Sequence, residues 1–409
     1  MVRYFIGVDW ADQEHRVCVL DEQGQQVLQK VLVNTPEALS EFGRWLFERC
    51  AEGILLQAAI EKPEGRIVDF LLDHGVEVYP INPKALDRVR DRYRASKSKS
   101  DAFDAFVLAD YLRTDQHRLS ALKPNSEQAA ELKMLTRDYH RLVAQQTRLI
   151  NQLKATLKEY YPRPLEVFED LATLSCLDFL RAYPTPQALE TLSRAWWQKF
   201  RKAHRMGPDQ MQKTWEILKA PQFAIPDHVV RSKSRLMLVL VEQMSLTAKA
   251  VGEYRQEVER FFTRLPVAKL AVSLPAGKSG VIVPTLFAEM GDAQGRWASF
   301  RHLQAEAGST PYTKQSGKSR TVHFRFCCNK RLRYAIYWMA FRSLTQSEWA
   351  RAYYQRQRDR GHTHHQALRA LGAKWLKIIF VMWRDQVPYS EDHHLANLYR
   401  QQSKQPVSA

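Results

Sequence analysis

Two carboxylates, Asp101 and Asp104, lie three positions apart in the segment KSKSDAFDAFVLADYLR. This segment predicts a helix behind a basic run, and helical geometry brings the two side chains onto one face, about 60° apart. Two more acids end predicted strands, Asp9 in RYFIGVD and Glu61 in LLQAAIE. Acids brought close together cannot all remain ionised without a compensating cation. The four acids therefore predict a divalent-metal site that supports nuclease-type chemistry.

Each of these acids also has a structural alternative. Asp9 could cap a turn, and Glu61 or its rival Glu64 could interact with the N-terminus of the following helix. Asp101 could be the N-cap of its own helix, which would leave Asp104 as a solvated acid of the first turn. Both would then face the surface. The ordered set of four favours a site for two Mg²⁺ ions, or Mn²⁺, over four unrelated roles.

A second candidate is Ser316 in the segment YTKQSGKSR. A serine hydroxyl is a weak nucleophile unless a base, a metal or strong positive charge activates it, and basic neighbours would orient a scissile phosphate. A Ser-Gly turn in a DNA-binding loop is the structural alternative, and Ser319 is an equally plausible hydroxyl. The residues expected to contact nucleic acid are Lys97, Lys99, Lys278, Lys314, Lys318, Arg320, Arg325, Lys330 and Arg331.

Composition supports a nucleic-acid partner. The 409 residues include 61 Lys and Arg against 44 Asp and Glu, a formal net charge of +17, which favours a polyanion. Five cysteines without a disulfide framework suit a reducing cytoplasm. The chain shows neither a signal pattern nor a run of 18 apolar residues, so we expect a cytoplasmic protein with no membrane contact, associated with the nucleoid while it acts.

The N-terminal part alternates strand and helix signals. Three strands (3–9, 15–21, 25–33) precede a helix at 36–50, which Thr35 and Pro36 begin. A strand at 54–60, a helix at 65–75 and a strand at 76–82 follow. This order predicts a ribonuclease-H-like, RuvC-like α/β domain over residues 1–120.

Residues 121–265 predict two long coiled-coil helices separated by a helical insert at about 161–229. Their apolar seams repeat at steps of three and four. The first seam is Leu132, Leu135, Tyr139, Leu142, Gln146, Leu149 and Leu153, and the second is Met237, Leu240, Met244, Thr247, Val251, Tyr254, Val258 and Phe261. The two helices could pair within one chain or between chains. In the insert, Thr185 and Pro186 begin a helix predicted to reach residue 200, and its Trp196 and Trp197 are expected to pack rather than to stack on bases.

A mainly helical C-terminal domain is predicted over residues 266–400. The segment LAVSLPAGKSGVIVPTLFAEMGD resembles an imperfect helix-hairpin-helix, with Ala276 and Lys278 where such hairpins are rich in glycine. The chain after about Asn397 is polar, and we expect a loose tail there, with residues 401–409 outside the domain.

Six segments together resemble the insertion-sequence-one-ten family of transposases, the bridge-RNA-guided DEDD recombinases. They are FIGVDWADQEHRVCVLDEQG, IEKPEGRIVDFLLDHGVEVYPINP, KSKSDAFDAFVLADYLR, SLPAGKSGVIVPTLFAEMGD, GSTPYTKQSGKSR and ALRALGAKWLKIIFVMWRDQVPYS. The resemblance covers nearly the full length. The chain departs from the family where Cys328 and Asn329 replace a glycine-asparagine pair, and in its insert.

The resemblance implies a RuvC-like domain, a coiled coil and a C-terminal transposase domain. Asp9, Glu61, Asp101 and Asp104 correspond to the metal-binding tetrad, and Ser316 to the catalytic serine that forms a covalent phosphoserine with DNA. It also implies a noncoding bridge RNA that pairs with donor and target double-stranded DNA. The protomers would assemble from dimers into a tetramer, in which another protomer contributes the serine.

Two other functions stay open at this point. A RuvC-like endonuclease would hydrolyse DNA with a metal-activated water, and Ser316 would only contact phosphate. A catalytically inert protein that binds RNA or DNA is the third possibility, and the intact set of four acids argues against it.

Overall fold

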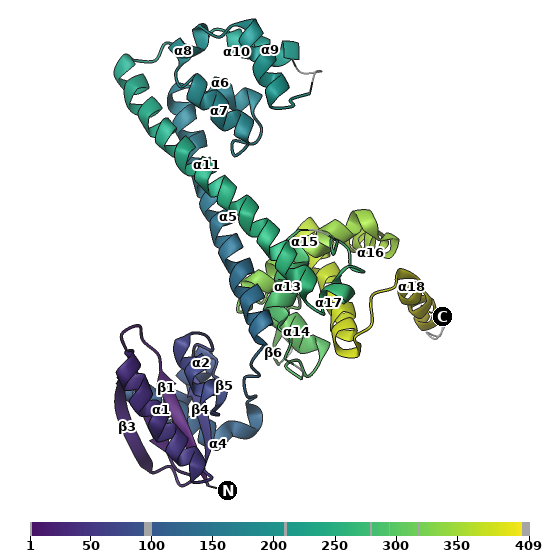
Figure 1. Ribbon diagram of the computed structural model, residues 1–409. Coiled ribbons are helices and arrows are strands. Elements are labelled where there is room, and N and C mark those ends of the chain that lie inside the picture. The colour runs from purple at the N-terminus through teal and green to yellow at the C-terminus, as the bar shows by residue number, and fades with distance from the viewer. Residues whose placement is uncertain are drawn as a thin grey trace. The chain divides into compact units, whose positions relative to one another are not determined.

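The computed structural model describes residues 2–93, 100–207, 211–278, 280–293, 295–317 and 319–402. The chain forms two compact units (Figure 1). The first unit contains the residues up to 124 together with 293–296, and the second contains 125–292 and the residues from 297 onward. The three-domain division expected from the sequence stays a prediction.

A five-stranded sheet organises the first unit, with strand order β3-β2-β1-β4-β5 (Figure 1). β2 pairs antiparallel with β1 and β3, and β4 pairs parallel with β1 and β5. The elements are β1 Arg3–Asp9, β2 Glu14–Leu20, β3 Gln26–Val33, α1 Pro36–Ala51, β4 Leu55–Ile60, α2 Arg66–Asp73, β5 Glu77–Pro80, α3 Pro83–Arg90, α4 Asp101–Asp115 and the 3-10 turn η1 Gln116–Arg118. The predicted order of strands and helices is confirmed.

The two faces of β1 pack against different helices, as alternation along a strand requires. Ile6 and Val8 are fully buried in a core that includes Phe42 of α1 and Leu71 of α2. Gly7 points to the other face, where a Cβ atom would lie 1.8 Å from the carbonyl oxygen of Ala105 in α4. Only glycine therefore lets α4 approach β1 this closely.

Two long helices, α5 Glu127–Tyr160 and α11 Asp227–Arg264, lie side by side and antiparallel in the second unit (Figure 1). Leu132 shares one core with Val258, and Leu153 shares another with Met237. Every predicted seam position is buried or half-buried. The helices thus pair within one chain, and the term coiled coil stays a prediction.

The insert between them is helical, as predicted. Its helices are α6 Arg163–Val167, α7 Leu174–Ala182, α8 Pro186–Glu190, α9 Arg194–Ala203 and α10 Met211–Lys219. Thr185 caps α8, but the single helix predicted for 186–200 is wrong. The Thr191 hydroxyl bonds back to the Ala188 carbonyl at 2.7 Å, and Ser193 then caps α9 as a new helix.

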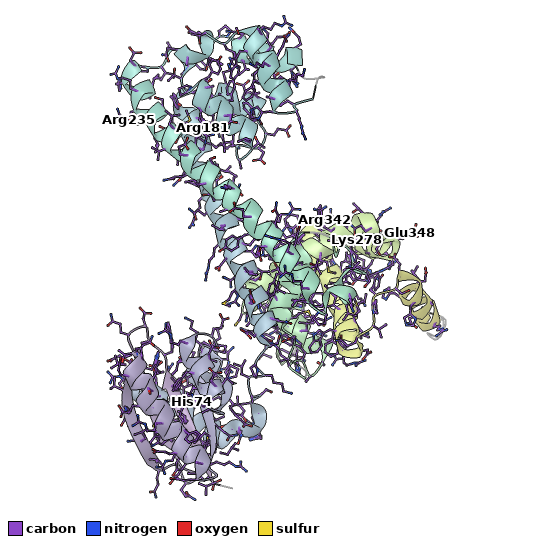
Figure 2. All side chains as sticks on the ribbon, viewed as in Figure 1. His74, Arg181, Arg235, Lys278, Arg342 and Glu348 are labelled. Carbon is purple, nitrogen blue, oxygen red and sulfur yellow. The ribbon has the colours of Figure 1, made fainter. Side chains whose placement is uncertain are left out.

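Packing of the insert explains its aromatic residues. Trp197 is fully buried, and Trp196 stacks on Phe200 with ring centroids 4.8 Å apart, so both tryptophans pack as predicted. Arg181, labelled in Figure 2, joins α7 to α11 through an ion pair of 2.8 Å with Glu242.

The rest of the second unit is mainly helical, around a core that α13, α15 and α17 share. Its elements are α12 Ala268–Ala271, α13 Ile282–Met290, α14 Phe300–Glu306, β6 Tyr312–Ser316, β7 Ser319–His323, α15 Lys330–Gln346, α16 Glu348–Asp359, α17 His364–Asp385 and α18 Glu391–Gln402. The loose tail predicted after Asn397 is wrong up to Gln402, because α18 continues to that residue behind the acidic first turn of Glu391 and Asp392. The remainder of the predicted tail, 403–409, lies outside the described residues. Within the described ranges, no helix is long and apolar enough to span a bilayer.

Candidate active site

Asp9 and Glu61 leave the same edge of the sheet. β1 and β4 run parallel with Val8 opposite Ile60, and the two acids are the next residue of each chain segment. Asp9 ends β1 as predicted, and Glu61 follows directly after β4. Because Asp9 is two residues beyond Gly7, its side chain points to the face that α4 covers.

Helix α4 supplies the other two acids from its first turn. Ser100, not Asp101, is the N-cap, since its hydroxyl accepts the Phe103 N–H at 3.3 Å. Asp101 is exposed, as expected. The expectation that Asp104 also faces the surface is wrong, because its residue is only 7% exposed. The carboxylate of Asp104 is therefore buried in the first unit rather than exposed to solvent.

The four acids act on one another electrostatically. The pKa of Asp9 is raised to about 6, first by burial and then by the charges of Asp104, Asp101 and Glu61, while Arg90 opposes the shift. Burial raises the pKa of a carboxyl group, and nearby like charges raise it further. Asp104, Asp101 and Glu61 thus act on the same carboxyl group of Asp9, and the role of the four acids as metal ligands stays a prediction.

Arg90 is a member of this cluster that sequence analysis missed. It lies in the last turn of α3, and its Nε donates to Oδ1 of Asp104 at 2.7 Å. Its Nη1 also donates to Asp87 at 2.6 Å. The only signal in the sequence was a basic residue in the last turn of a helix, where arginine commonly serves to stabilise the helix end.

The donor set suits a hard divalent cation in its chemistry. Carboxylate oxygens are the ligands that Mg²⁺ prefers, and a cation would relieve the repulsion that raises the pKa of Asp9. Among the described residues, no three His, Cys, Asp or Glu side chains lie close enough together to hold a metal ion as they are now oriented. Arg90 provides the positive charge beside Asp104 in this arrangement.

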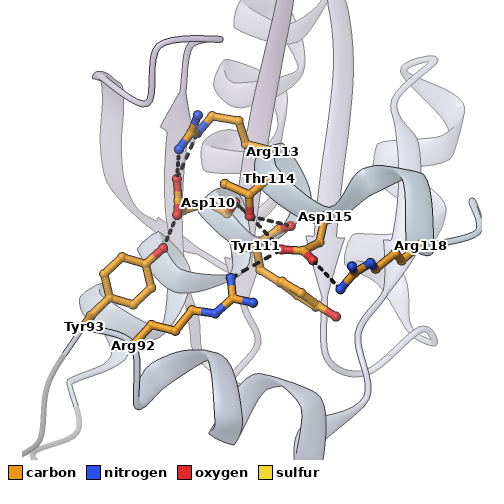
Figure 3. Close-up of polar contacts among 8 residues, drawn as sticks. All are labelled: Arg92, Tyr93, Asp110, Tyr111, Arg113, Thr114, Asp115 and Arg118. Carbon is orange, nitrogen blue, oxygen red and sulfur yellow. Dashed lines mark hydrogen bonds and ion pairs between the residues drawn. The ribbon is translucent and has the colours of Figure 1, made fainter.

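Further polar contacts fix α4 (Figure 3). Asp110 accepts hydrogen bonds from the Tyr93 hydroxyl and from Nε of Arg113, the latter at 2.9 Å. Asp115 pairs with Arg92 at 3.4 Å. Asp110 and Asp115 are each 7% exposed. Through these two buried acids, Arg92 and Tyr93 are bound to the middle and end of α4. The first turn of the same helix carries Asp101 and Asp104.

Ser316 lies at the tip of an exposed hairpin in the second unit. It ends β6 and pairs with Ser319, the first residue of β7. Gly317 follows with φ of +55°, the left-handed conformation that a tight hairpin turn needs and that glycine adopts readily. The basic segment around Ser316 thus forms two short strands joined at a Ser-Gly turn, and the serine residue is exposed.

Most of the predicted nucleic-acid contacts that can be placed are exposed. Lys97, Lys99 and Lys318 lie outside the described residues. The exposed ones are Lys278, Lys314, Arg320, Lys330 and Arg331, and Figure 2 labels Lys278. Arg325 is half-buried, and its guanidinium lies 5.9 Å from the ring centre of Tyr312 in the hairpin.

The turn around Lys278 differs from a phosphate-binding hairpin. The Gly280 N–H donates to the Glu259 carboxylate at 2.7 Å, and the Ala276 N–H donates to the Gln346 side chain at 3.0 Å. Backbone N–H groups that already bind protein oxygens are less able to hold a phosphate. Helices α12 and α13 flank this turn, as the resemblance to a helix-hairpin-helix predicts, but these two N–H groups of the turn already bind protein oxygens.

A buried polar network sets the start of α15, close in sequence to the hairpin. Asn329 caps α15 by accepting the Arg331 and Leu332 N–H groups, and its Nδ2 donates to Glu289 at 2.9 Å. Arg137 of α5 also binds Glu289, at 2.9 and 3.1 Å. Asn329 thus has a structural role. Glu289 was not predicted, since it stands alone in an apolar helix.

Comparison with known proteins identifies the family. A model described as Transposase matches residues 6–162, and one described as Transposase IS116/IS110/IS902 family matches residues 273–355. The chain is 30% identical over 380 residues, 91% of its length and 92% of the relative's, to the transposase ascribed to the IS117 mini-circle of Streptomyces coelicolor. It is 29% identical to the 43.6 kDa protein of insertion element IS110 from the same organism, over 94% of this chain and 95% of that protein. It is also 28% identical to the 42 kDa protein of IS900 from Mycobacterium paratuberculosis, over 94% and 96%. The chain therefore belongs to the IS110 family of transposases.

Proposed function

We propose that this transposase cuts and rejoins double-stranded DNA through a phosphoserine intermediate on Ser316, with help from Mg²⁺ at the four acids of a RuvC-like first unit. The observation that carries the proposal is the placement of the acids: Asp9 and Glu61 follow paired positions of the parallel strands β1 and β4, and α4, which begins with Asp101 and Asp104, packs on β1 at Gly7. A transposase has to stabilise charge on a DNA phosphate, and carboxylates that lie near one another can recruit a metal for this task.

In the serine step, one bond to phosphorus forms as another breaks, so strands can be exchanged without net hydrolysis. The Ser316 oxygen forms a bond to phosphorus while the bond from phosphorus to a deoxyribose oxygen breaks. The serine proton ends on that departing oxygen. For exchange, this hydroxyl attacks the phosphoserine formed on a different strand, which joins the two strands and releases that serine, and the proton returns to the serine oxygen. The exposed hairpin leaves the hydroxyl accessible to DNA, and Lys314 and Arg320 beside it would orient the phosphate.

Asp9, Glu61, Asp101 and Asp104 would hold the metal, and Mg²⁺ bound there would neutralise charge that develops on the phosphate oxygens. Asp104 would then either bind both Arg90 and the metal, or release Arg90 and bind the metal instead. The proposal includes a noncoding bridge RNA that selects donor and target sites by pairing, and a tetramer in which the acids and Ser316 come from different protomers. Copurification of one discrete RNA tests the guidance.

Ser316→Ala is expected to abolish covalent protein–DNA adducts and strand exchange, by at least about a thousandfold, because no other atom replaces the attacking oxygen. Denaturing gels with labelled donor and target DNA would measure both products. Ser319→Ala is the matched control, since Ser319 pairs with Ser316 in the same hairpin, and it should retain adducts. Adducts that survive in Ser316→Ala would exclude Ser316 as the nucleophile.

A second candidate is a RuvC-like endonuclease that hydrolyses DNA with an activated water. It is favoured by one observation: all four acids belong to the first unit, whereas Ser316 belongs to the second. For this function Ser316→Ala would keep cleavage, and the wild type would form no adduct. The experiment on Ser316 therefore separates the two functions.

Asp9→Asn is expected to stabilise the metal-free protein at pH 7.5 by a few degrees in Tm. The pKa of Asp9 is raised in the folded state, so its ionisation costs stability as the pH rises through about 6, and the advantage of asparagine should shrink towards pH 5. Mg²⁺ at 10 mM should raise the Tm of the chelator-treated wild type but not of Asp9→Asn, because only the former keeps the ligand. Thermal unfolding of Asp12→Asn, an exposed neighbour, provides the control. An equal rise in Tm on addition of Mg²⁺ in Asp9→Asn and in Asp12→Asn would contradict a metal site at Asp9.

A further inference from the structure

A cavity of about 640 Å³ opens beside the base of the serine hairpin, within the second unit. Val322 and His323 of β7 line one side, and residues of α14, α16 and α17 line the others. Its volume is in the range of sites that enclose small organic molecules. The four acids and Ser316 do not line it, so it is separate from the groups assigned to DNA cleavage.

Its chemistry combines aromatic rings with positive charge. Phe300, Phe324 and Tyr353 contribute rings, and Arg369, Lys374 and Lys377 contribute cations. No carboxylate is present among the described residues that line the cavity. A site with this composition favours an anion that carries a flat apolar part.

The cations lie over the rings rather than away from them. Nζ of Lys377 lies 5.2 Å from the ring centre of Phe300, and Nζ of Lys374 lies 5.7 Å from that of Tyr353. The Arg369 guanidinium is 4.9 Å from Phe324, and its pKa is lowered by burial and by the nearby Arg333. Arg369, Lys374 and Lys377 all belong to α17, so one helix supplies these positive charges, which an incoming phosphate would neutralise.

A nucleotide has the matching parts. Its base can stack on an aromatic or guanidinium plane, and its phosphate can pair with lysine or arginine. Paired bases inside a duplex cannot reach such a cavity, so the nucleotide has to be extruded from the stack or already unpaired. A simple inorganic anion would pair with the cations but would make no stacking contact with the aromatic rings.

The hairpin connects this cavity to the proposed nucleophile. Tyr312 pairs with His323 at the base, where the cavity begins, and Ser316 stands four residues further along β6. At about 3.3 Å per residue, the hydroxyl lies roughly 13 Å from the base. Duplex phosphates advance by about 3.4 Å per nucleotide, so the distance corresponds to roughly four steps.

We propose that this cavity binds one unpaired deoxynucleotide of the DNA strand that the hairpin contacts, with the base among Phe300, Phe324 and Tyr353 and the phosphate at Lys374 and Lys377. The inference rests on DNA being the substrate under the proposed function, but it does not depend on serine chemistry or on a metal. Holding one extruded nucleotide would fix the register of the strand relative to Ser316.

The test uses the full-length protein and three labelled duplexes at 150 mM salt: fully paired, with one unpaired thymidine, and with an abasic residue at the same position. Fluorescence anisotropy should show about tenfold tighter binding of the unpaired thymidine than of either other duplex. Lys374→Gln/Lys377→Gln should remove this preference. Tyr353→Leu should make the unpaired and abasic duplexes bind alike.

Lys154→Gln/Lys158→Gln removes the same charge from exposed positions of α5, and it should lower affinity for all three duplexes without changing the preference. Equal binding of the three duplexes by the wild type would overturn the proposal. So would an equal loss of preference in both double variants. Binding is measured without turnover, so a failure here is distinguishable from a failure of the Ser316 adduct assay.

Discussion

Arg137→Met is expected to lower the free energy of unfolding of the second unit by about 3–5 kcal/mol, because it leaves a buried carboxylate without its charged partner. Glu289 is 1% exposed, and Arg137 binds both of its oxygens. Burial alone would raise the pKa of Glu289, but the hydrogen bonds from Arg137 and Asn329 outweigh it, so the pKa is lowered. The ionised form therefore belongs to the folded state.

The pH dependence follows from this direction. In the wild type, the stability that Glu289 contributes is present above the unfolded pKa of about 4.5 and is lost as the pH falls through the lower folded value. Without Arg137, burial should raise the pKa of Glu289 instead. Protonation of Glu289 at low pH then removes the cost of a buried, unpaired charge in the variant. The difference between wild type and Arg137→Met should be largest near pH 7 and should narrow towards pH 4.

Urea denaturation followed by tryptophan fluorescence measures this effect, because most tryptophans lie in the second unit. Arg141→Met is the matched control. It is one turn further along α5, and its side chain is 72% exposed and pairs with Asp138 at the surface, so its loss should cost under about 1 kcal/mol. Arg137→Met/Glu289→Gln should recover part of the stability, since glutamine still accepts from Asn329 and carries no charge. A loss of less than about 1 kcal/mol in Arg137→Met would contradict the assigned role.

Local patterns predicted the elements but not the contacts between them. The segments RYFIGVD and ILLQAAI identified the strands around Asp9 and Glu61, and the seams of α5 and α11 identified the helices that pair. These signals are repeated over many residues, so one exception does not obscure them. The position of Asp104 depends instead on Arg90, a residue of another helix. No spacing rule connects the two.

Short elements were also hard to predict. The helix expected at 186–200 breaks where Thr191 and Ser193 bond to the backbone, a choice between helix continuation and capping that a few tenths of a kcal/mol can decide. The hairpin that carries Ser316 has strands of five residues that are almost wholly exposed. They lack the buried face whose apolar residues would have marked them as strands.

Gly7→Ala is expected to reduce both stability and DNA chemistry, although it adds only a methyl group. A Cβ atom at residue 7 would lie 1.8 Å from the Ala105 carbonyl oxygen and 2.7 Å from the Ala109 nitrogen. Both are backbone atoms of α4, so the helix has to move away from β1. Overpacking of this kind costs about 1–3 kcal/mol or more. Asp104 immediately precedes Ala105, so the displacement would also carry its carboxylate away from Asp9.

The atoms that a Cβ at residue 7 would meet belong to the backbone of α4, so removing a neighbouring side chain should not relieve the clash. Ala105→Gly removes a side chain but not the carbonyl, so Gly7→Ala/Ala105→Gly should remain as impaired as Gly7→Ala alone. Gly252→Ala in the interior of α11, where nothing lies within 4 Å, should instead be neutral or slightly stabilising. Thermal unfolding with and without Mg²⁺, together with the adduct assay, separates loss of folding from loss of alignment. If Gly7→Ala kept the wild-type Tm and full adduct formation, close approach of α4 to β1 would not be what positions the acids.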